Sequence, residues 1–293
     1  MTLREYLARQ QQIIDAELDR LVPPEATAPA TIHRAMRYSL FAGGKRIRPI
    51  LCVEAARALG DEFSGVVAAS CALELIHTYS LIHDDLPALD NDDYRRGKLT
   101  NHKVFGDAMA ILAGDSLLTF AFQVLAQLAL ADDRKTRMIA ELSVAAGTVG
   151  GMIGGQVADL EGEGQTPTAA LLESIHRAKT GALLRASLRL GAIYAGADAQ
   201  QYDALSRYGE HIGLAFQIVD DILDVEESSE SLGKTAGKDA QQQKITFPAV
   251  YGLEKSRRMA AEQCAAAHVT LDPFGERATR LHELADHIVQ RKS

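Results

Sequence analysis

Apolar residues recur at helical spacing along almost the whole chain, and no segment shows the strict alternation of a β-strand. Polar segments and segments rich in Pro and Gly interrupt this pattern and mark the ends of the predicted helices. The sequence therefore predicts an all-α fold. The pattern places helices at about 2–20, 29–42, 47–59, 64–85, 105–130, 133–158, 168–195, 198–226, 244–268 and 276–290.

Composition supports a large helical core. Hydrophobic residues make up 47% of the 293 residues and aromatic residues only 5%, with no Trp. The chain is roughly twice as long as a usual domain, yet no linker rich in Pro, Gly, Ser or charge divides it. We therefore predict one domain that spans 1–293.

Charge and cysteine usage exclude several classes of protein. The net charge of −8 disfavours nucleic acid, so an anionic substrate needs local basic clusters. The charged start MTLREYLARQ argues against secretion and favours a cytoplasmic location. The cysteines lack metal-ligand spacing, and we expect them to be small buried hydrophobes of a reducing cytosol. They are Cys52, Cys71 and Cys264.

Some other features have ordinary structural interpretations. The uncharged stretch before Asp159 is too short and too weakly apolar for a membrane span. Its Gly147, Gly151 and Gly155 are expected on one face of a closely packed helix. The three histidines near the C-terminus are expected to be ordinary helix-surface residues. They are His268, His282 and His287.

Two acidic clusters at the ends of apolar helices are the most informative feature for function. Pro87 should end the first helix, so that the last aspartate of that cluster returns from the loop. Spacings of three and four residues place the second cluster on one helix face. Buried carboxylates need cations, and Mg²⁺ completes its coordination with phosphate oxygens, so the clusters predict several Mg²⁺ ions around a diphosphate. The clusters are Asp84, Asp85 and Asp90, and Asp220, Asp221 and Asp224.

Basic loops follow both clusters, RRGK at 95–98 and LGKTAGK at 232–238, which indicates two facing halves around one site. Arg binds phosphate oxygens as a fork and Lys as a point charge. His77 has two open interpretations, a core or rim histidine and a phosphate contact. The basic candidates are Lys45, Arg46, Arg48, Arg95, Arg96, Lys179, Lys234, Lys238 and Lys244.

Two other kinds of site are disfavoured. Gly233-Lys234-Thr235 suggests a P-loop, but Ser228 stands where the P-loop pattern requires Gly and a helix is predicted where it requires a strand. No Ser/His/Asp or Cys/His arrangement emerges from the sequence.

Six ordered motifs resemble those of the trans-isoprenyl diphosphate synthases, and the match runs nearly end to end. The aspartates of the first motif have the wider spacing of the bacterial short-chain branch. The resemblance implies a single large bundle of about ten helices around a central cavity, with an isoprenoid-synthase type of fold. The motifs are GGKRIRP at 43–49, DDLPALDNDDYRRGK at 84–98, GGQVADL at 154–160, KTG at 179–181, FQIVDDILD at 216–224 and LGKTAGKDAQQQKITFP at 232–248.

The resemblance also implies residue roles. Three Mg²⁺ ions on an allylic diphosphate would be held by Asp84, Asp85, Asp90, Asp220 and Asp224, with Asp221 as a further catalytic aspartate. The same diphosphate would be bound by Arg95, Lys179, Lys234 and Lys244. The diphosphate of isopentenyl diphosphate would be bound by Lys45, Arg48, His77 and Arg96, where some family members have Gln in place of His77. Oxygens of Thr180 and Gln217 would face the allylic carbons.

The implied activity is Mg²⁺-dependent condensation of isopentenyl diphosphate with dimethylallyl or geranyl diphosphate. Tyr79 and Ser80 lie before Asp84 on the same helix and would set product length, with Tyr79 about 7.5 Å deeper. An aromatic residue there favours farnesyl diphosphate, with geranylgeranyl diphosphate as the alternative. The resemblance also implies a homodimer.

Two other functions fit parts of the sequence. A terpene cyclase shares the fold and the first aspartate motif, but its second metal motif differs and it has no use for GGKRIRP. A non-catalytic partner subunit tends to lose aspartates, whereas this chain keeps both sets.

Overall fold

A computed structural model describes residues 1–60, 65–164, 166, 168–226 and 245–291. Most of the described residues are helical and only a short hairpin forms strands, which confirms the all-α prediction. The chain divides into two compact units, Met1–Ile50 with Ser64–Ile139, and Leu51–Phe63 with Ala140–Ser293. A single domain over 1–293 stays a prediction.

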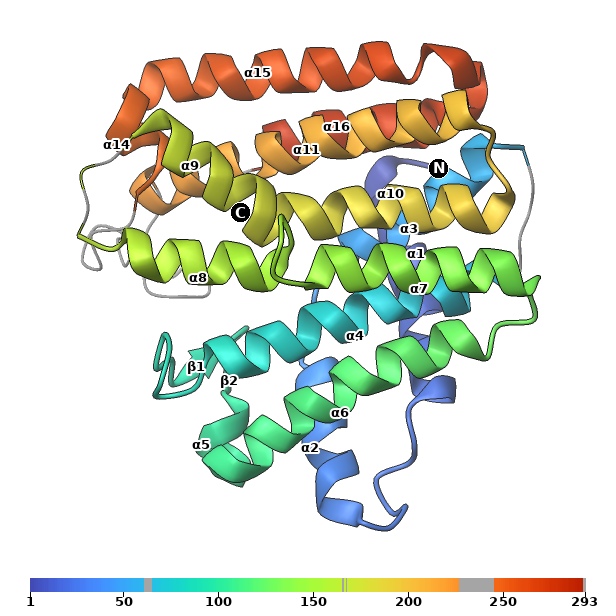
Figure 1. Ribbon diagram of the computed structural model, residues 1–293, viewed down its shortest axis with the longest axis vertical. Coiled ribbons are helices and arrows are strands. Elements are labelled where there is room, and N and C mark those ends of the chain that lie inside the picture. Colours follow the sequence, from blue (N-terminus) through green and yellow to red (C-terminus); the bar gives the residue numbers. More distant parts are fainter. Residues whose placement is uncertain (61–64, 165, 167, 227–244, 292–293) are drawn as a thin grey trace. The chain divides into compact units, whose positions relative to one another are not determined.

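The first unit is built around helix α4 (Val66–Asp84), which packs against α1, α2 and α6 (Figure 1). Most α4 residues are buried because the helix is apolar on nearly all sides. The other elements are α1 (Leu3–Leu21), α2 (Ala30–Leu40), the antiparallel hairpin of β1 (Tyr94–Arg95) and β2 (Lys98–Leu99), α5 (Asn101–Phe105) and α6 (Asp107–Ala126).

Two helices of the described residues, α4 and α6, pass a test of length and apolarity for a membrane span. Because α4 is mostly buried, its apolarity is that of a core helix. The helix α6 is less covered within its unit, and Ile111 and Leu112 are 44% and 52% exposed.

The second unit is a layered set of long helices in which α11 (Ala199–Glu226) packs against α10, α15 and α16 (Figure 1). Its core includes Ile218, Ile222 and Phe247. The remaining elements are α8 (Met152–Gly162), α9 (Ala169–His176), the π-helix η1 (Arg177–Gly181), α10 (Ala182–Ala195), α14 (Phe247–Tyr251), α15 (Leu253–Thr270), the 3₁₀ segment η2 (Asp272–Ala278) and α16 (Thr279–Gln290). Helices α3 (Ile47–Ala58) and α7 (Asp132–Ala146) begin in the first unit and end in the second.

Four of the predicted helices are interrupted, and glycine explains part of this difference. The predicted 105–130 helix breaks at Gly106 and the 133–158 helix breaks before α8, where Gly150 adopts φ +65°. Positive φ is available to glycine at little cost and ends a helix. The expectation that Gly147, Gly151 and Gly155 share one helix face is therefore wrong, because α7 ends at Ala146 and α8 begins at Met152.

The other interruptions have different forms. The predicted 168–195 helix contains the π-helix η1, and the 244–268 segment divides into α14 and α15 at Gly252. The β1–β2 hairpin was not predicted, because two residues per strand are too few to show alternation.

Candidate active site

The first aspartate cluster forms where α4 ends. Asp84 is the last helical residue, and the loop then turns back, so that the amide of Asp90 donates to the carbonyl oxygen of Asp84 at 2.8 Å. Asn91 adopts φ +51°, and its amide donates to the carbonyl of Leu86 at 3.1 Å. The backbone therefore brings Asp90 next to the helix end. This agrees with the prediction that Pro87 ends the helix and that Asp90 returns from the loop.

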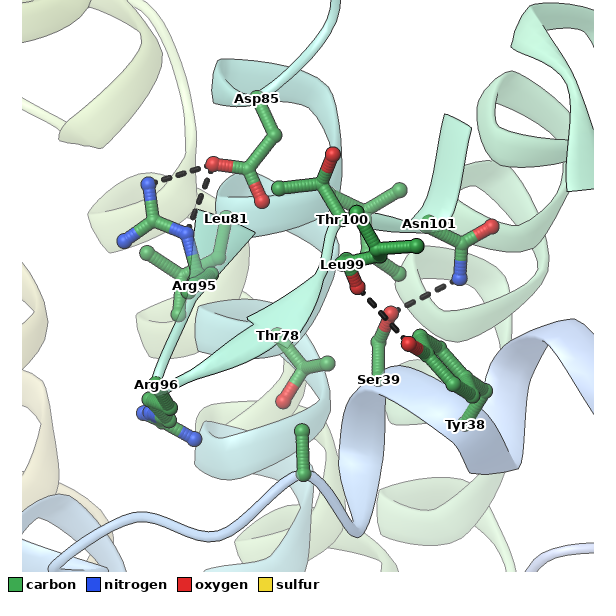
Figure 2. Close-up of a pocket in the computed structure, with 12 residues that line it drawn as sticks. Tyr38, Ser39, Thr78, Leu81, Asp85, Arg95, Arg96, Leu99, Thr100 and Asn101 are labelled. Carbon is green, nitrogen blue, oxygen red and sulfur yellow. Dashed lines mark hydrogen bonds and ion pairs between the residues drawn. The ribbon is translucent and has the colours of Figure 1, made fainter. Parts of the chain in front are cut away.

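Arg95 of β1 is paired with Asp85, which is only 3% exposed. The Nε and Nη2 atoms of Arg95 lie 2.7 and 2.6 Å from Oδ1 of Asp85 (Figure 2). Burial raises the pKa of Asp85, and the hydrogen bond from Arg95 opposes part of that rise. The end of α4 therefore presents both anionic and cationic groups in one place.

Arg46 has a structural position in the GGKRIRP loop. Its Nε donates to Asp15 at 2.7 Å and its Nη1 to Glu74 at 2.6 Å, while Nη2 donates to the carbonyl of Leu40 at 2.6 Å. Both Arg46 and Glu74 are almost fully buried. These hydrogen bonds are all made within the protein, so the role of Arg46 is to fix the conformation of the loop. Of the other two basic residues of the motif, Lys45 is exposed and Arg48 is half-buried.

Gly44 of the same loop makes room for Arg96. A Cβ atom on Gly44 would lie 2.7 Å from Nη1 of Arg96, and Gly44 has φ +137°. Nη1 of Arg96 donates to the carbonyl oxygen of Gly43. The close approach explains why glycine, with no side chain, suits this loop.

His77 of α4 lies among positive charges. Burial lowers its pKa well below 6.5, and the charges of nearby arginines lower it further, so the imidazole is neutral at pH 7. Those arginines are Arg48, Arg96, Arg95 and Arg46. The positive surroundings agree with the phosphate-contact interpretation, which the sequence left open.

The second aspartate cluster lies near the end of α11, and its three carboxylates differ in their surroundings. Asp221 and Asp224 are buried, whereas the side chain of Asp220 is 42% exposed. Oδ2 of Asp221 accepts a hydrogen bond from the amide of Phe247 at 2.8 Å and lies 3.4 Å from Nε2 of His176. Oδ1 of Asp224 is buried and has no hydrogen-bond partner among the described residues.

Asp220 interacts with Arg291, which follows α16. Nη2 of Arg291 donates to Oδ1 of Asp220 at 3.1 Å and to the carbonyl oxygen of Phe216 at 3.0 Å. The guanidinium carbon also lies 3.8 Å from the centre of the Phe216 ring. A cation therefore already faces the exposed member of this cluster.

Lys179 and Thr180 lie in the π-helix η1. This conformation is rare in proteins, and where it occurs it is often at a functional site. Nζ of Lys179 lies 2.6 Å from Oδ2 of Asp159 on α8. A Cβ atom on Gly155 would lie 2.1 Å from the backbone nitrogen of Lys179, so only glycine permits this packing of α8 on η1. Thr180 and Gln217 are both half-buried.

Known proteins identify the family. The polyprenyl synthetase family model matches residues 29–272. The chain belongs to the polyprenyl synthetase family. The prediction made from the six motifs is thus confirmed.

Similar polyprenyl synthetases carry different product names. The chain is 49% identical over 272 residues to a farnesyl diphosphate synthase of Geobacillus stearothermophilus, covering 91% of this chain and 90% of the relative. It is 51% identical over 267 residues to a chloroplastic geranylgeranyl pyrophosphate synthase of Capsicum annuum, covering 90% and 72%. The crystal structure of an FPP/GFPP synthase of Zymomonas mobilis has a TM-score of 0.86 at 36% identity and covers 98% of both chains. These names leave the product of this polyprenyl synthetase open between farnesyl and geranylgeranyl diphosphate.

Tyr79 lies deeper in α4 of this polyprenyl synthetase and is 5% exposed. Its ring packs edge-on against His83, with ring centres 5.7 Å apart. His83 in turn fits against α6 only because residue 114 is glycine, where a Cβ would lie 2.1 Å from Nε2 of His83. Ser80 donates its hydroxyl to the carbonyl of His77 at 2.9 Å.

Three polar partners were missed in the sequence of this polyprenyl synthetase: Asp159, His176 and Arg291. Asp159 lies within the GGQVADL motif, which gave a signal, while His176 precedes the KTG motif by three residues. Arg291 is a single charged residue outside the six motifs, and no sequence pattern signals its role. The predicted ligands Lys234 and Lys244, with Lys238, lie outside the described residues.

Proposed function

We propose that this chain condenses isopentenyl diphosphate with dimethylallyl or geranyl diphosphate and releases farnesyl diphosphate and inorganic diphosphate. Geranylgeranyl diphosphate is the alternative product, because relatives of both names have similar identity to this chain. The observation that carries the proposal is the end of α4. There one turn gathers the aspartates of the first motif, and buried Asp85 is paired with Arg95.

The aspartates fit Mg²⁺. Carboxylate oxygens are hard ligands, and Mg²⁺ binds few of them while keeping positions for phosphate oxygens and water. The buried Oδ1 of Asp224, with no hydrogen-bond partner in the described residues, suits a cation. We assign the metal ions, three by family resemblance, to Asp84, Asp85, Asp90, Asp220 and Asp224.

The allylic diphosphate would be bound by Arg95 and Lys179, together with Lys234 and Lys244. In the structure Arg95 is paired with Asp85 and Lys179 with Asp159. Substrate binding would therefore exchange these internal ion pairs for phosphate contacts. When bound, Mg²⁺ would neutralise the charge that develops on the leaving diphosphate. Arg95 and Lys179 would add fixed positive charge to the same oxygens.

The second diphosphate, that of isopentenyl diphosphate, would be bound by Lys45, Arg48, His77 and Arg96. The neutral imidazole of His77 can donate one hydrogen bond to a phosphate oxygen without adding charge. Arg46 belongs to the same motif, but its three guanidinium nitrogens donate to Asp15, Glu74 and the carbonyl oxygen of Leu40. It would therefore shape the loop instead of binding substrate.

Carbon–carbon bond formation follows departure of the allylic diphosphate. The allylic C–O bond breaks with both electrons on oxygen, and the double bond of isopentenyl diphosphate attacks the resulting carbocation. Hydroxyl and amide oxygens of Thr180 and Gln217 would stabilise that cation, while surrounding apolar side chains exclude water. The released diphosphate would take the proton that is lost when the new double bond forms.

Tyr79 would limit the length of the product. Its ring is buried and supported by His83, so a growing chain that reached it would meet a braced aromatic side chain. Replacement by Ala removes that ring, and we expect Tyr79→Ala to give longer products. Unchanged product length in mass spectrometry would exclude Tyr79 from this role. Ser80→Phe, one residue along the helix, is the matched variant for a shift toward shorter products.

The decisive experiment measures prenyl transfer by the purified chain with Mg²⁺, isopentenyl diphosphate and each allylic diphosphate. Released diphosphate and prenyl products are quantified, and mass spectrometry gives the product length. We expect Asp84→Asn and Asp220→Asn to lower kcat by roughly 10²- to 10³-fold, and chelation of divalent ions to abolish turnover. Asp203→Asn, on the exposed face of α11, is the matched control and should keep full activity.

The outcomes of this experiment separate the alternatives. A terpene cyclase would release diphosphate without isopentenyl diphosphate, and a non-catalytic subunit would release none alone. Full activity in both aspartate variants, or in the presence of a chelator, would refute the proposed metal chemistry.

We also propose a homodimer in the cytoplasm. The α5–α6 segment exposes the apolar side chains of Val104, Ile111 and Leu112 by 44%, 44% and 52%, and neighbouring exposed apolar side chains are a common feature of subunit interfaces. A second copy would cover this surface. Light scattering during size-exclusion chromatography should give twice the 31.7 kDa chain mass, and a monomer mass would contradict the proposal.

A further inference from the structure

Helices α15 and α16 of the second unit bring together four side chains that the prenyl-transfer chemistry does not use. Cys264 and His268 are four residues apart on α15, and His282 and Asp286 are four residues apart on α16, so each pair lies on one helix face. The two helices pack against each other. Cys264 is buried, as expected, but its sulfur contacts polar side chains. The expectation that His268 and His282 are ordinary surface residues is wrong, because pairing of the helices places both in a polar cluster.

The distances within this cluster are short. Sγ of Cys264 lies 3.6 Å from Nε2 of His268 and 3.6 Å from Oδ1 of Asp286. Nε2 of His268 lies 2.8 Å from Oδ1 of Asp286. One sulfur, one nitrogen and one oxygen thus converge on a single point, all within 4.8 Å of one another.

This triangle has the dimensions of a transition-metal site. In a tetrahedral Zn²⁺ site the bonds to sulfur and nitrogen are about 2.3 and 2.0 Å long, which places neighbouring ligand atoms about 3.3 to 3.6 Å apart. Both sulfur distances already match. The nitrogen–oxygen distance of 2.8 Å is that of a hydrogen bond, and it would open by about 0.5 Å around an ion.

We propose that Cys264, His268 and Asp286 bind one Zn²⁺ ion, with water in the fourth position, and that this ion joins α15 to α16. Thiolate and imidazole ligands favour Zn²⁺ over Mg²⁺, so this site is chemically distinct from the aspartate clusters. The ion takes the place of the Sγ proton that Cys264 donates to Asp286, and that proton goes to solvent.

His282 completes the arrangement as a positioning residue. Its Nδ1 lies 2.6 Å from Nδ1 of His268, and the two rings stack with an interplanar angle of 9°. If His268 binds the ion through Nε2, its Nδ1 carries a proton and donates to the neutral ring of His282. Metal-binding histidines almost always donate a hydrogen bond from their second ring nitrogen in this way, which fixes the tautomer and the ring orientation.

An ion can reach the cluster from solvent. The side chains of His268 and Asp286 are 32% and 52% exposed, while Cys264 is buried beneath them. The helical backbone holds Cys264 and His268 one turn apart, so little side-chain ordering is needed on binding. The cluster is therefore accessible to solvent through His268 and Asp286, and the helix holds Cys264 in place beneath them.

Cobalt titration tests the site directly, because a Co²⁺–thiolate bond gives a charge-transfer absorption that the aspartate clusters cannot produce. The full chain, with a phosphine reductant and excess Mg²⁺, should show this band and saturate at one equivalent of Co²⁺. Zinc should then displace the cobalt and remove the band. Added Zn²⁺ should also raise the Tm of the full chain.

Variants separate this site from adventitious binding. Cys264→Ser should remove the band, and His268→Gln and Asp286→Asn should weaken cobalt binding, whereas His282→Ala should weaken it roughly 10- to 100-fold without removing the thiolate. Cys52→Ala and His287→Gln are the matched controls and should leave the band unchanged. Circular dichroism verifies that each variant is folded.

Two results would overturn the proposal: no thiolate band at saturating Co²⁺, or a band that persists in folded Cys264→Ser. A Zn²⁺-dependent rise in Tm that is equal in the chain and in folded His268→Gln would also place the zinc elsewhere.

Discussion

Gly155→Ala should damage catalysis more than its size suggests, because one methyl group would push α8 away from the π-helix that carries Lys179. The new Cβ atom would lie 2.1 Å from the backbone nitrogen of Lys179, 2.5 Å from its Cα atom and 2.8 Å from the carbonyl carbon of Ala178. These are backbone atoms, so no side-chain rotation relieves the overlap. One of the two helices must move.

The size of that movement follows from the contact distances. Ordinary carbon contacts begin at about 3.5 Å, so the helices must separate by roughly 1 Å. Overpacking of this kind costs about 1 to 3 kcal/mol of stability. Because a misplacement of about 1 Å can cost roughly 10²-fold in rate, kcat should fall by about that factor if Lys179 holds the leaving diphosphate.

The matched control lies at the other end of the same helix. A Cβ atom on Gly162 would meet only the ends of three flexible side chains, at 3.5 to 3.8 Å. Gly162→Ala should therefore keep activity and fold at least as stably. The assay is steady-state prenyl transfer with isopentenyl and geranyl diphosphates, combined with thermal unfolding of both variants.

Two results would contradict parts of this reasoning. If Gly155→Ala kept the kcat of the parent while losing stability, the packing argument would stand but the position of Lys179 would not matter for catalysis. If neither quantity changed, the close approach of α8 to η1 would be wrong.

Three further predictions follow from other contacts. Arg46→Met should lower the unfolding free energy by about 3 to 5 kcal/mol, because it leaves Glu74 charged and buried. A second change, Glu74→Gln, should restore much of that stability in denaturant unfolding, and equal stability of the single and double variants would contradict the prediction. His77→Gln should keep activity, and its unfolding free energy should fall less steeply than that of the parent as the pH drops below about 6.5. The pKa of His77 is lowered in the folded chain, so the unfolded chain binds the proton more strongly and the parent loses stability in that window. Unfolding midpoints at pH 5, 6 and 7 provide the check. Asp221→Asn should lower stability by about 1 to 3 kcal/mol through weaker acceptance of the Phe247 amide, and an unchanged Tm would show that this bond is not important for α14.

The helices were predictable because they depend on local pattern. Segments such as Val66–Asp84 and Ala199–Glu226 carry long apolar periodicity, and the structure places their ends within two residues of the expected ones. The interruptions were less predictable, because a glycine within a periodic segment can stay helical or adopt positive φ. At Gly150 and Gly252 the tertiary structure favours the second conformation.

The aspartates were predictable for a different reason. A carboxylate at the end of an apolar helix contradicts its local environment, and such contradictions are expected at functional sites. What stayed hidden is which cation each carboxylate meets. Arg95 meets Asp85 because the loop that joins α4 to β1 turns back, and Arg291 meets Asp220 across 71 residues of sequence.

The Cys264 cluster shows where sequence reasoning stops. Each helix carries its own visible pair, C-x₃-H on α15 and H-x₃-D on α16, and spacing alone places each pair on one face. Neither pair is a metal site by itself, because two ligands rarely hold an ion. Only the packing of α15 against α16 brings the third ligand atom within reach, and that packing depends on the apolar faces of both helices. Ligand pairs with i, i+4 spacing on neighbouring helices are therefore worth testing together, even where each one alone looks like solvated surface.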